Sequence, residues 1–436
     1  MYEIKSLFFS IILHFSSLKM NVFETENQEK MKFRQNTSSF CSEAAMFLSG
    51  AFLAFLFVWS LWCFTTPPPS FFSFLPSKTP TQPDPTTFYD DPDLGYTIET
   101  RVQNWDEKRK QWLNLHPEFS GTERVVMVTG SQPGPCKNSM GDHILLRFFK
   151  NKVDYCRIHG YDIFYNNVLL DQRMFTYWAK YPAVKAAMIA HPEAEWIWWV
   201  DSDAVITDMD FNLPLEKYKA YSLIIHGWDH LVFQKKSWTG LNAGVFLIRN
   251  CQWSMDLLER WAKFGPSSPD YEKWGKIQKS IFPDKTFPEA DDQTGIAYIM
   301  VKEGKKWNDK IYLEKQYYFE GYWVEIVDKL ENITAYYSKI ERRERMLRRK
   351  HAEKRGEDYR AQWEEMIEED KMRRPFITHF TGCEPCSGKH NEKYSREDCL
   401  KGMNMALNFG DNQVLRNFGY FRPDLANTSV VQPIVF

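Results

Sequence analysis

The sequence predicts an α/β domain whose sheet begins with parallel strands, behind a single membrane-spanning helix. Three observations support this prediction. Strand and helix patterns alternate over residues 124–203, an uncharged apolar segment fills residues 44–64, and a stretch rich in Pro, Ser and Thr separates the two. Alternating strands and helices favour parallel strands, because each helix crosses over the sheet and returns the chain to its starting edge.

The alternation begins with an apolar strand over 124–131 and a helix over 141–160 that ends at Gly160. A strand over 161–167 and a helix over 174–195 follow; Pro182 should break that helix, and Pro192 should end it. The third strand covers 196–203. Further elements are expected as strands at 221–228 and 240–250, helices at 251–264 and 294–303, a strand entering a Cys/Gly loop at 375–386, and a charged, solvated helix or insertion at 339–372.

The apolar segment 44–64 carries no charge and is long enough to cross a hydrocarbon layer of roughly 30 Å. Lys30, Lys32 and Arg34 precede it, which favours a cytosolic N-terminus. A cleaved signal peptide fits poorly, because the segment begins late, is long and has no small-residue cleavage site after it. A buried core helix is the other alternative, and it fits less well than a membrane span.

We therefore expect four parts in a single-pass type II protein: a cytosolic tail (1–43), a signal anchor (44–64), an extended stem (65–95) and a lumenal folded domain (96–436). The Pro-rich composition of the stem does not support a regular element. The sequons at Asn332 and Asn427 would face the lumen, whereas the one at Asn36 would be cytosolic and unused.

Charge and cysteine content narrow the class of protein. Lys and Arg number 55 against 57 Asp and Glu, and this balance argues against a nucleic-acid binder, which needs a basic excess. In an oxidising lumen disulfides are expected among Cys136, Cys156, Cys251, Cys383, Cys386 and Cys399, with the connectivity left open. Cys383 and Cys386 form a CxxC without a second one, so a disulfide-rich loop fits better than a zinc site.

The strongest chemical signal is Asp201-Ser202-Asp203 directly after the third strand. Ligands of such sheets bind beyond the carboxyl ends of the strands, and two carboxylates at this spacing can both reach one hard divalent cation. A cation of this kind offsets the charge of a diphosphate. Two alternatives stay open: a turn or helix cap, and an aspartyl phosphatase with Asp201 as nucleophile and Asp203 as acid/base. Two strands before the motif argue against the phosphatase, whose motif normally opens its domain.

Three further groups of polar residues are candidates. Asp291 and Asp292 precede a helix, so they either cap it or surround a sugar, and Gln293 could offer its amide carbonyl to a developing oxocarbenium ion. His379 is either structural or a metal ligand beside Asp203. Asn242, between Gly240 and Gly244, is either a tight turn or a ligand contact. Among the many aromatic residues, Trp228 and Trp323 are the best candidates for stacking on an acceptor sugar.

A set of motifs in one order resembles the plant family of xyloglucan 6-xylosyltransferases and galactomannan 6-galactosyltransferases. These motifs are WWVDSDA, IIHGW, KKSWTGLNAGVFLIRNCQWS, EADDQTG, THFTGCEPCSG and LNFGDNQVLRNFGY, and the resemblance covers roughly residues 89–433. It implies a GT-A fold with a Rossmann-like mixed sheet, residence in the Golgi membrane, and Mn²⁺-dependent, retaining transfer from a UDP-sugar to a β-1,4-linked polysaccharide.

The resemblance also implies roles for individual residues. Asp201, Ser202 and Asp203 would bind UDP and Mn²⁺, with His379 as the remaining protein ligand of the metal. Asp291, Asp292 and Gln293 would surround the donor sugar and its anomeric carbon, and Asn242 would contact the donor. The strand end Thr129-Gly130-Ser131 would cradle the uridine. Xylosyltransferases carry a Lys after the first Cys of the GCxPC loop; here Glu384 stands there, so either Lys389 contacts the diphosphate or the loop binds differently.

Within this family, GLNAGVF, HGW and FEGYW look more like the galactosyltransferases. We therefore expect transfer of galactose from UDP-galactose to O6 of a β-1,4-mannan, with a mannan synthase or a second copy of the chain as candidate partners. The alternatives are a xylosyltransferase using UDP-xylose on β-1,4-glucan and, more distantly, a non-catalytic subunit of a polysaccharide synthase.

Overall fold

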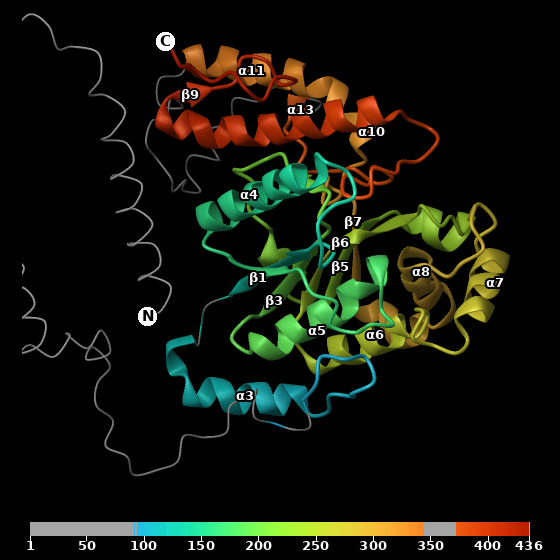
Figure 1. Cartoon of the computed structure of the whole chain (residues 1–436). Coiled ribbons are helices and arrows are strands. Elements are labelled where there is room, and N and C mark those ends of the chain that lie inside the picture. Colours follow the sequence, from blue (N-terminus) through green and yellow to red (C-terminus); the bar gives the residue numbers. More distant parts are fainter. Residues whose placement is uncertain (1–90, 92–93, 120, 122, 344–371, 436) are drawn as a thin grey trace, which may run out of the picture. The chain divides into compact units, whose positions relative to one another are not determined.

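A six-stranded mixed sheet with the strand order β2-β1-β3-β6-β5-β7 forms the centre of the folded unit (Figure 1). The structure is a computed structural model, and it describes residues 91, 94–119, 121, 123–343 and 372–435. The strands are β1 (Val125–Gly130), β2 (Asp162–Asn166), β3 (Trp196–Val200), β5 (Leu223–Gly227), β6 (Leu241–Arg249) and β7 (Ile311–Glu314). All five strands predicted for this sheet are present, and β7 was not predicted.

The direction of the strands changes in the middle of the sheet. β1 pairs in parallel with β2 and β3, as the alternation of strands and helices predicts. β6 runs antiparallel to both β3 and β5, and β7 returns to a parallel pairing with β5. The sheet is therefore mixed, as the family resemblance implies, and the parallel arrangement expected from the pattern holds for its first three strands.

Alternating side chains of the strands bury both faces of the sheet. Val126, Val128, Ile197 and Trp199 belong to the core on one face. Their neighbours in the sequence, such as Met127 and Trp198, belong to the core on the other face. This two-residue period is the expected geometry of a strand, and burial on both faces explains why the strand sequences are almost wholly apolar.

Helices cover both faces (Figure 1). On one face lie α5 (Lys180–Ala190), α6 (Gln252–Ala262) and α8 (Asp292–Lys302), with α7 (Tyr271–Ile281) and α9 (Gly304–Trp307) packed against α8. On the other face lies α4 (Gly141–His159), which is covered in turn by α13 (Arg396–Leu415), α11 (Leu330–Arg343) and the short α10 (Trp323–Ile326). A two-stranded ribbon of β9 (Tyr420–Phe421) and β10 (Gln432–Pro433) follows α13.

One predicted helix boundary is confirmed and another is wrong. Gly160 caps α4 in the left-handed conformation, with φ of 69°, as expected where the helix stops. Pro182 does not break the second helix. A short 3₁₀ turn over Thr176–Ala179 precedes α5, which begins at Lys180, so Pro182 lies in its first turn. The backbone N–H that proline lacks has no intrahelical partner there in any case.

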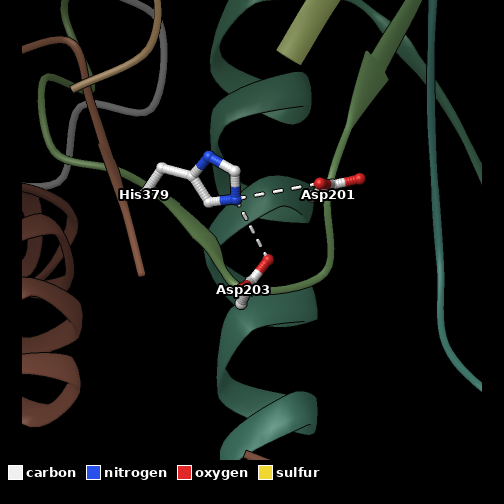
Figure 2. Close-up of side chains that lie close together, drawn as sticks. All are labelled: Asp201, Asp203 and His379. Carbon is white, nitrogen blue, oxygen red and sulfur yellow. Dashed lines mark hydrogen bonds and ion pairs between the residues drawn. The ribbon is translucent and has the colours of Figure 1, made fainter. Parts of the chain in front are cut away.

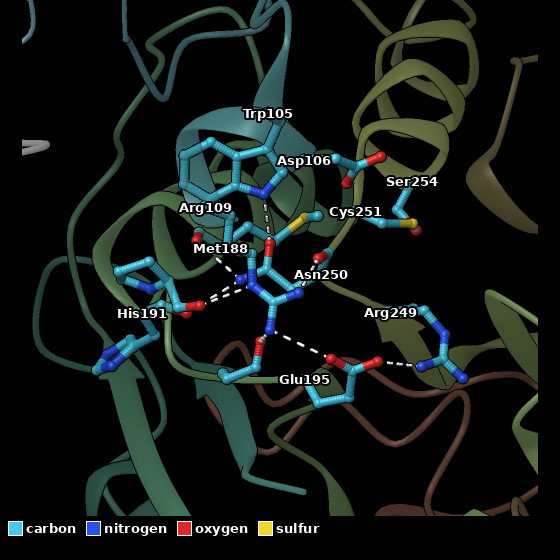
Figure 3. A network of polar contacts seen from close by, with 12 residues as sticks. Trp105, Asp106, Arg109, Met188, His191, Glu195, Arg249, Asn250, Cys251 and Ser254 are labelled. Carbon is cyan, nitrogen blue, oxygen red and sulfur yellow. Dashed lines mark hydrogen bonds and ion pairs between the residues drawn. The ribbon is translucent and has the colours of Figure 1, made fainter. Parts of the chain in front are cut away.

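Helix α3 (Trp105–Leu115) is attached at the edge of the sheet where β3 begins (Figure 3). The guanidinium of Arg109 donates to the backbone carbonyls of Pro192, Ala194 and Asn250 over 2.6–2.9 Å. The indole N–H of the buried Trp105 donates to Asn250 Oδ1 over 2.7 Å. This network holds the start of the folded domain at the end of the sheet opposite to the carboxyl end of β3.

A second, two-stranded sheet joins distant parts of the chain. β4 (Ala204–Ile206) follows the Asp-Ser-Asp motif and pairs antiparallel with β8 (Ile377–His379), so that Ala204 lies opposite His379. β8 is the predicted apolar strand ahead of the Cys/Gly loop.

Two disulfides, Cys136–Cys386 and Cys383–Cys399, tie the Cys/Gly loop to the segment after β1 and to α13. The prediction of a disulfide-rich loop is confirmed, and both cysteines of the CxxC are used in it. Cys156 and Cys251 are free, so the expected pairing extends to four of the six cysteines of the folded domain.

Several predictions fall on residues outside the described ranges: the tail 1–43, the span 44–64, the stem up to residue 90 and the charged segment 344–371. Within the described residues, the helices are too short or too polar to span a membrane. The predicted division of the chain into four parts therefore stays a prediction.

Candidate active site

The Asp-Ser-Asp motif lies where the main sheet passes into the small one. Asp201 directly follows the buried β3, and Asp203 directly precedes β4. Strand β1 is the parallel neighbour of β3, so Thr129 and Gly130 at the end of β1 lie at the same edge of the sheet as the motif. The predicted position of the motif, beyond the carboxyl ends of parallel strands, is confirmed.

Asp201, Asp203 and His379 converge on one point (Figure 2). One side-chain ligand atom from each lies within 4.8 Å of the others. His379 Nε2 is 3.3 Å from Asp203 Oδ1 and 3.8 Å from Asp201 Oδ2. The three side chains therefore form one possible set of ligands for a metal ion, although His379 comes from the far end of the chain.

Gly244 on β6 completes this cradle by having no side chain. A Cβ atom at this position would lie 2.3 Å from Cε1 of His379 and 2.6 Å from Oδ2 of Asp201. Both distances are far below any normal contact, so even alanine would displace one of the two ligands. The backbone carbonyl of Gly244 also accepts a hydrogen bond of 2.8 Å from the N–H of Asp201. The glycine thus allows β6 to approach the carboxylate and the imidazole closely.

Glu320 orients the imidazole of His379 from behind. Its Oε1 lies 3.2 Å from Nδ1, which leaves Nε2 directed at the two aspartates. Burial disfavours a charge on His379, but the carboxylates of Asp203 and Glu320 outweigh it and raise the pKa of His379 to about 10. A metal ion would replace the proton on Nε2, because a ligating imidazole nitrogen is unprotonated.

The donor set fits a divalent cation such as Mn²⁺. Two carboxylates supply hard oxygen ligands, one imidazole supplies nitrogen, and a carboxylate hydrogen-bonded to the other imidazole nitrogen is the usual support for a ligating histidine. Three protein ligands also leave positions for the oxygens of a diphosphate.

Lys180, at the start of α5, connects the two acidic motifs. Its Nζ lies 2.7 Å from Asp292 Oδ2 and 3.5 Å from Asp201 Oδ1, and it donates to the carbonyl of Ala243 over 2.9 Å. The side chain is 2% exposed. Burial opposes its charge, but Asp201 and Asp292 outweigh this and raise the pKa of Lys180. Asp201 and Asp292, which are far apart in the sequence, therefore share one buried ammonium group.

Asp291 is the N-cap of α8, which is one of the two roles predicted for this residue. Its Oδ1 accepts from the backbone N–H of Thr294 over 2.8 Å, and Oδ2 accepts from the Thr294 hydroxyl over 2.5 Å. The buried Lys285 lies 2.7 Å from the same Oδ2. The carboxylate of Asp291 thus has a clear structural role, and its predicted place around the donor sugar stays a prediction.

Gln293 and Asn242 both contact the backbone of β6 at Ala243 and Gly244. The amide of Gln293 donates to the carbonyl of Trp238 over 2.8 Å, and its Oε1 lies 3.4 Å from the N–H of Ala243. Asn242 Oδ1 accepts from the N–H of Gly244 over 2.7 Å. Asn242 is therefore part of the strand that supports the metal cradle, and the amide plane of Gln293 is held by backbone groups.

The predicted uridine cradle at the end of β1 is partly closed by β2. The N–H of Ser131 donates to the carbonyl of Asn166, and its hydroxyl accepts from the phenol of Tyr165 over 2.7 Å. Thr129 is buried, and its hydroxyl has no hydrogen-bond partner among the described residues. A Cβ on Gly130 would lie 2.2 Å from the carbonyl oxygen of Asn166, so only glycine fits at this strand end.

Lys389 and Glu384 lie in the loop tied down by the two disulfides. Their backbones pair, since the N–H of Glu384 donates to the Lys389 carbonyl over 3.0 Å. Glu384 accepts a hydrogen bond from the Ser387 hydroxyl, and both Glu384 and Lys389 are exposed. The loop follows His379 by a few residues, and the role of Lys389 at a diphosphate stays a prediction.

Of the two tryptophans predicted to stack on an acceptor sugar, one is buried, so that prediction is wrong. Trp323 is only 6% exposed and stacks on Phe380 with ring centroids 5.5 Å apart, so it belongs to the core. Trp228 is 38% exposed at the end of β5 and packs edge-on against His226. It remains available for contact with a sugar.

The sequence did not predict three functional candidates, which are Lys180, Glu320 and Lys152. Burial lowers the pKa of Lys152 to about 7, against the opposing charges of Asp203 and Asp201. Either charge state of its amine has enough N–H groups for its two carbonyl partners, which belong to Ser202 and Ala204. Each of these charged residues lies within an apolar stretch of the sequence, which indicates that it is buried. The sequence does not reveal which group it contacts in the fold.

A mixed α/β sheet with an acidic, metal-compatible site at its edge is compatible with a sugar-nucleotide-dependent glycosyltransferase. The sequence model of the galactosyl transferase GMA12/MNN10 family matches residues 121–390. The chain therefore belongs to the galactosyl transferase GMA12/MNN10 family and is a glycosyltransferase. The aspartyl-phosphatase alternative is set aside, because β1 and β2 precede the motif and the family is a different one.

Similar plant proteins include members with different sugars in their names. Galactomannan galactosyltransferase 1 from Cyamopsis tetragonoloba is 52% identical, over 93% of this chain and 98% of that protein. Glycosyltransferase 6 from Arabidopsis thaliana is 53% identical, over 92% and 97%. Probable xyloglucan 6-xylosyltransferase 1 from Oryza sativa subsp. indica is 45% identical, over 78% and 70%. The family resemblance predicted from the motifs is thereby confirmed.

Proposed function

We propose that this chain transfers galactose from UDP-galactose to O6 of mannosyl residues in a β-1,4-mannan, with retention of configuration and with Mn²⁺ bound by Asp201, Asp203 and His379. The observation that carries the proposal is the convergence of these three side chains at the carboxyl edge of the sheet. The similarity to a galactomannan galactosyltransferase along nearly the whole of both chains supports galactose and mannan.

In this proposal, the metal supplies positive charge that offsets the diphosphate of the donor. The chain's own residues do the rest of the positioning. Glu320 aims His379 Nε2 at the site, and Gly244 leaves room between His379 and Asp201. The strand end at Thr129 to Ser131 takes the uridine, and Lys389 reaches the diphosphate from the disulfide-tied loop.

The transfer itself breaks the bond between the anomeric carbon and the diphosphate oxygen and forms a bond to the acceptor O6. The electron pair of the broken bond stays with UDP, and the proton of O6 passes to the departing diphosphate on the same face. No strong nucleophile is then needed. The amide of Gln293, oriented by Trp238 and Ala243, and the carboxylate of Asp292, paired with Lys180, flank the anomeric carbon and stabilise its developing positive charge.

The proposed acceptor is a long β-1,4-linked backbone that lies across the edge of the sheet, with Trp228 as a stacking surface. The proposed location is the Golgi membrane, through the apolar segment 44–64, with the folded domain in the lumen. The exposed sequons at Asn332 and Asn427 and the two disulfides agree with an oxidising lumen.

A xylosyltransferase acting on β-1,4-glucan is the second candidate. The probable xyloglucan 6-xylosyltransferase from rice, at 45% identity, favours it. Galactose differs from xylose by one CH₂OH group, and a single such group changes discrimination in a pocket only modestly. The motifs GLNAGVF, HGW and FEGYW and the higher identity to the galactomannan galactosyltransferase favour galactose.

The test offers UDP-galactose and UDP-xylose, each with a manno-oligosaccharide and a cello-oligosaccharide, to the full chain with Mn²⁺. Galactose on the manno-oligosaccharide supports the proposal. Xylose on the cello-oligosaccharide moves the chain to the second candidate and keeps the site. Absence of transfer in all four pairs, with UDP binding absent as well, contradicts both and favours a non-catalytic subunit. The Asp203→Ala variant serves as the negative control.

A further inference from the structure

Lys152, on α4, reaches under the loop that carries Asp201 and Asp203. Its Nζ donates to the carbonyl of Ala204 over 2.8 Å and to the carbonyl of Ser202 over 3.2 Å. These two carbonyls belong to the residues immediately before and after Asp203. The lysine is only 1% exposed, so water does not satisfy its amine.

Burial of the Lys152 amine destabilises the fold unless both of its hydrogen bonds are kept. A buried amine without hydrogen-bond partners destabilises a fold, as does any unpaired buried polar group. Lys152 avoids this cost only when the carbonyls of Ser202 and Ala204 point toward α4. The peptide group that joins Ser202 to Asp203 and the one that joins Ala204 to Val205 are therefore held in one orientation, and the backbone of Asp203 is fixed between them.

The same helix also supports the strand that carries His379. The ring of Phe148, one turn before Lys152 on α4, packs edge-on against Phe380 with centroids 6.2 Å apart, and Lys152 Nζ lies 5.4 Å from the Phe148 ring. Phe380 follows His379 directly, and its N–H donates to the carbonyl of Asp203 over 3.1 Å. The backbone of Asp203 is thus held by α4 from one side and by the His379 segment from the other.

We infer that Lys152 is a positioning residue of the metal site: by binding the carbonyls of Ser202 and Ala204, the residues before and after Asp203, it sets the distance between the carboxylate of Asp203 and the imidazole of His379. This inference rests on the proposed function, because the Mn²⁺ site is part of it. Lys152 is not a ligand of the metal and does not touch the substrate in this proposal. It acts through the backbone of the loop.

Lys185, on α5, offers a matched control. It is also 1% exposed, and it also donates to two backbone carbonyls, those of Thr97 and Thr100. These carbonyls belong to the segment before α3, which is attached away from the metal site. Replacing either lysine by methionine removes the same chemical group from the same kind of environment, so the two variants differ in location and not in chemistry.

The experiment titrates Mn²⁺ into the full chain at saturating UDP and follows free Mn²⁺ by electron paramagnetic resonance. We expect the dissociation constant of Mn²⁺ to rise about 10- to 100-fold in Lys152→Met, the range seen when a group supporting a metal ligand is removed. In Lys185→Met it should stay within about twofold of the original chain, although both variants lose thermal stability. Turnover of Lys152→Met should recover at high Mn²⁺, since only the affinity of the site is impaired.

The outcomes separate the inference from the proposed function. Unchanged Mn²⁺ affinity in Lys152→Met, or equal weakening in both methionine variants, overturns the positioning role. Failure of the original chain to bind Mn²⁺ with UDP overturns the metal assignment, and the inference with it. If Lys152→Met does not fold, Lys152→Gln takes its place; its shorter side chain keeps an N–H₂ donor, and its Mn²⁺ affinity should fall in the same direction or the inference is wrong.

Discussion

His379 Nε2 lies 3.3 Å from Oδ1 of Asp203, a residue 176 positions earlier in the chain. The contact depends on the pairing of β4 with β8, which places Ala204 opposite His379. A shift of this pairing by one residue would turn the imidazole to the other face of the ribbon. The register of two three-residue strands therefore determines whether the metal site exists.

Removal of either partner in this contact should abolish metal-dependent donor binding. In Asp203→Ala and His379→Ala we expect the Mn²⁺-dependent part of UDP binding, measured by isothermal titration calorimetry, to disappear. His191→Ala is the control, because His191 is a histidine with a glutamate partner, Glu193, away from the site. UDP affinity equal to that of the original chain in either variant would contradict the ligand assignment.

Gly244→Ala should close the metal cradle while the fold persists. The added Cβ would lie within 2.6 Å of Asp201 and still closer to His379, so one ligand must move. We expect at least a tenfold loss of Mn²⁺ affinity, on the order of 1.4 kcal/mol. Gly134→Ala is the matched control, since a Cβ at Gly134 would meet nothing within 4 Å. Equal affinities in the two variants would show that the approach of β6 is unimportant.

Glu320→Ala should weaken the metal site without removing a ligand. The imidazole of His379 loses the carboxylate that supports its Nδ1, and loss of such support costs about 10- to 100-fold in metal affinity. The apparent activation constant for Mn²⁺ in the transferase assay should rise accordingly. Glu325→Ala, an exposed glutamate on the neighbouring α10, should leave it unchanged. A normal constant for Glu320→Ala would mean that the strand alone positions His379.

Lys180 and Asp292 should be coupled in a double-mutant cycle. Lys180→Met leaves the carboxylate of Asp292 buried without its ion-pair partner, which costs on the order of 3–5 kcal/mol. Asp292→Asn in the Lys180→Met background should recover part of this loss, since a neutral amide needs no counter-charge. Urea unfolding of the four proteins measures the coupling. Strictly additive losses would contradict a direct ion pair.

Lys185 should give the stability of the fold a pH dependence. Burial lowers the pKa of Lys185 from 10.5 to about 8, with Glu259 opposing the shift. The unfolded chain therefore binds more protons than the folded one between pH 8 and 10.5, and the folded state gains stability as the pH rises through this window. Relative to Lys185→Met, the original chain should gain thermal stability between pH 7.5 and 9.5. A constant difference between the two melting temperatures would contradict the lowered pKa.

Local patterns of the sequence were enough for much of the fold. The apolar runs around Val126 and Trp198 predict strands because both faces of the sheet are buried, and Gly160 predicts the end of α4 because its conformation is left-handed. The break predicted at Pro182 is wrong, because proline is acceptable in the first turn of a helix. Packing decides where that first turn begins. β7 has a short sequence with no distinct period, so its place at the edge was not predictable.

The amino-acid pattern alone predicts the acidic edge of the sheet, where an apolar strand is followed by Asp201 and Asp203, and it predicts a set of motifs that includes His379. Three contacts became visible in the folded chain: Lys180 links Asp201 to Asp292, and Glu320 supports the imidazole of His379. Gly244 leaves space between His379 and Asp201. This difference arises from the range of the interactions along the chain. Strand and turn preferences act between neighbours in the chain, whereas the ion pair, the supporting carboxylate and the empty space arise from contacts between separate strands and helices.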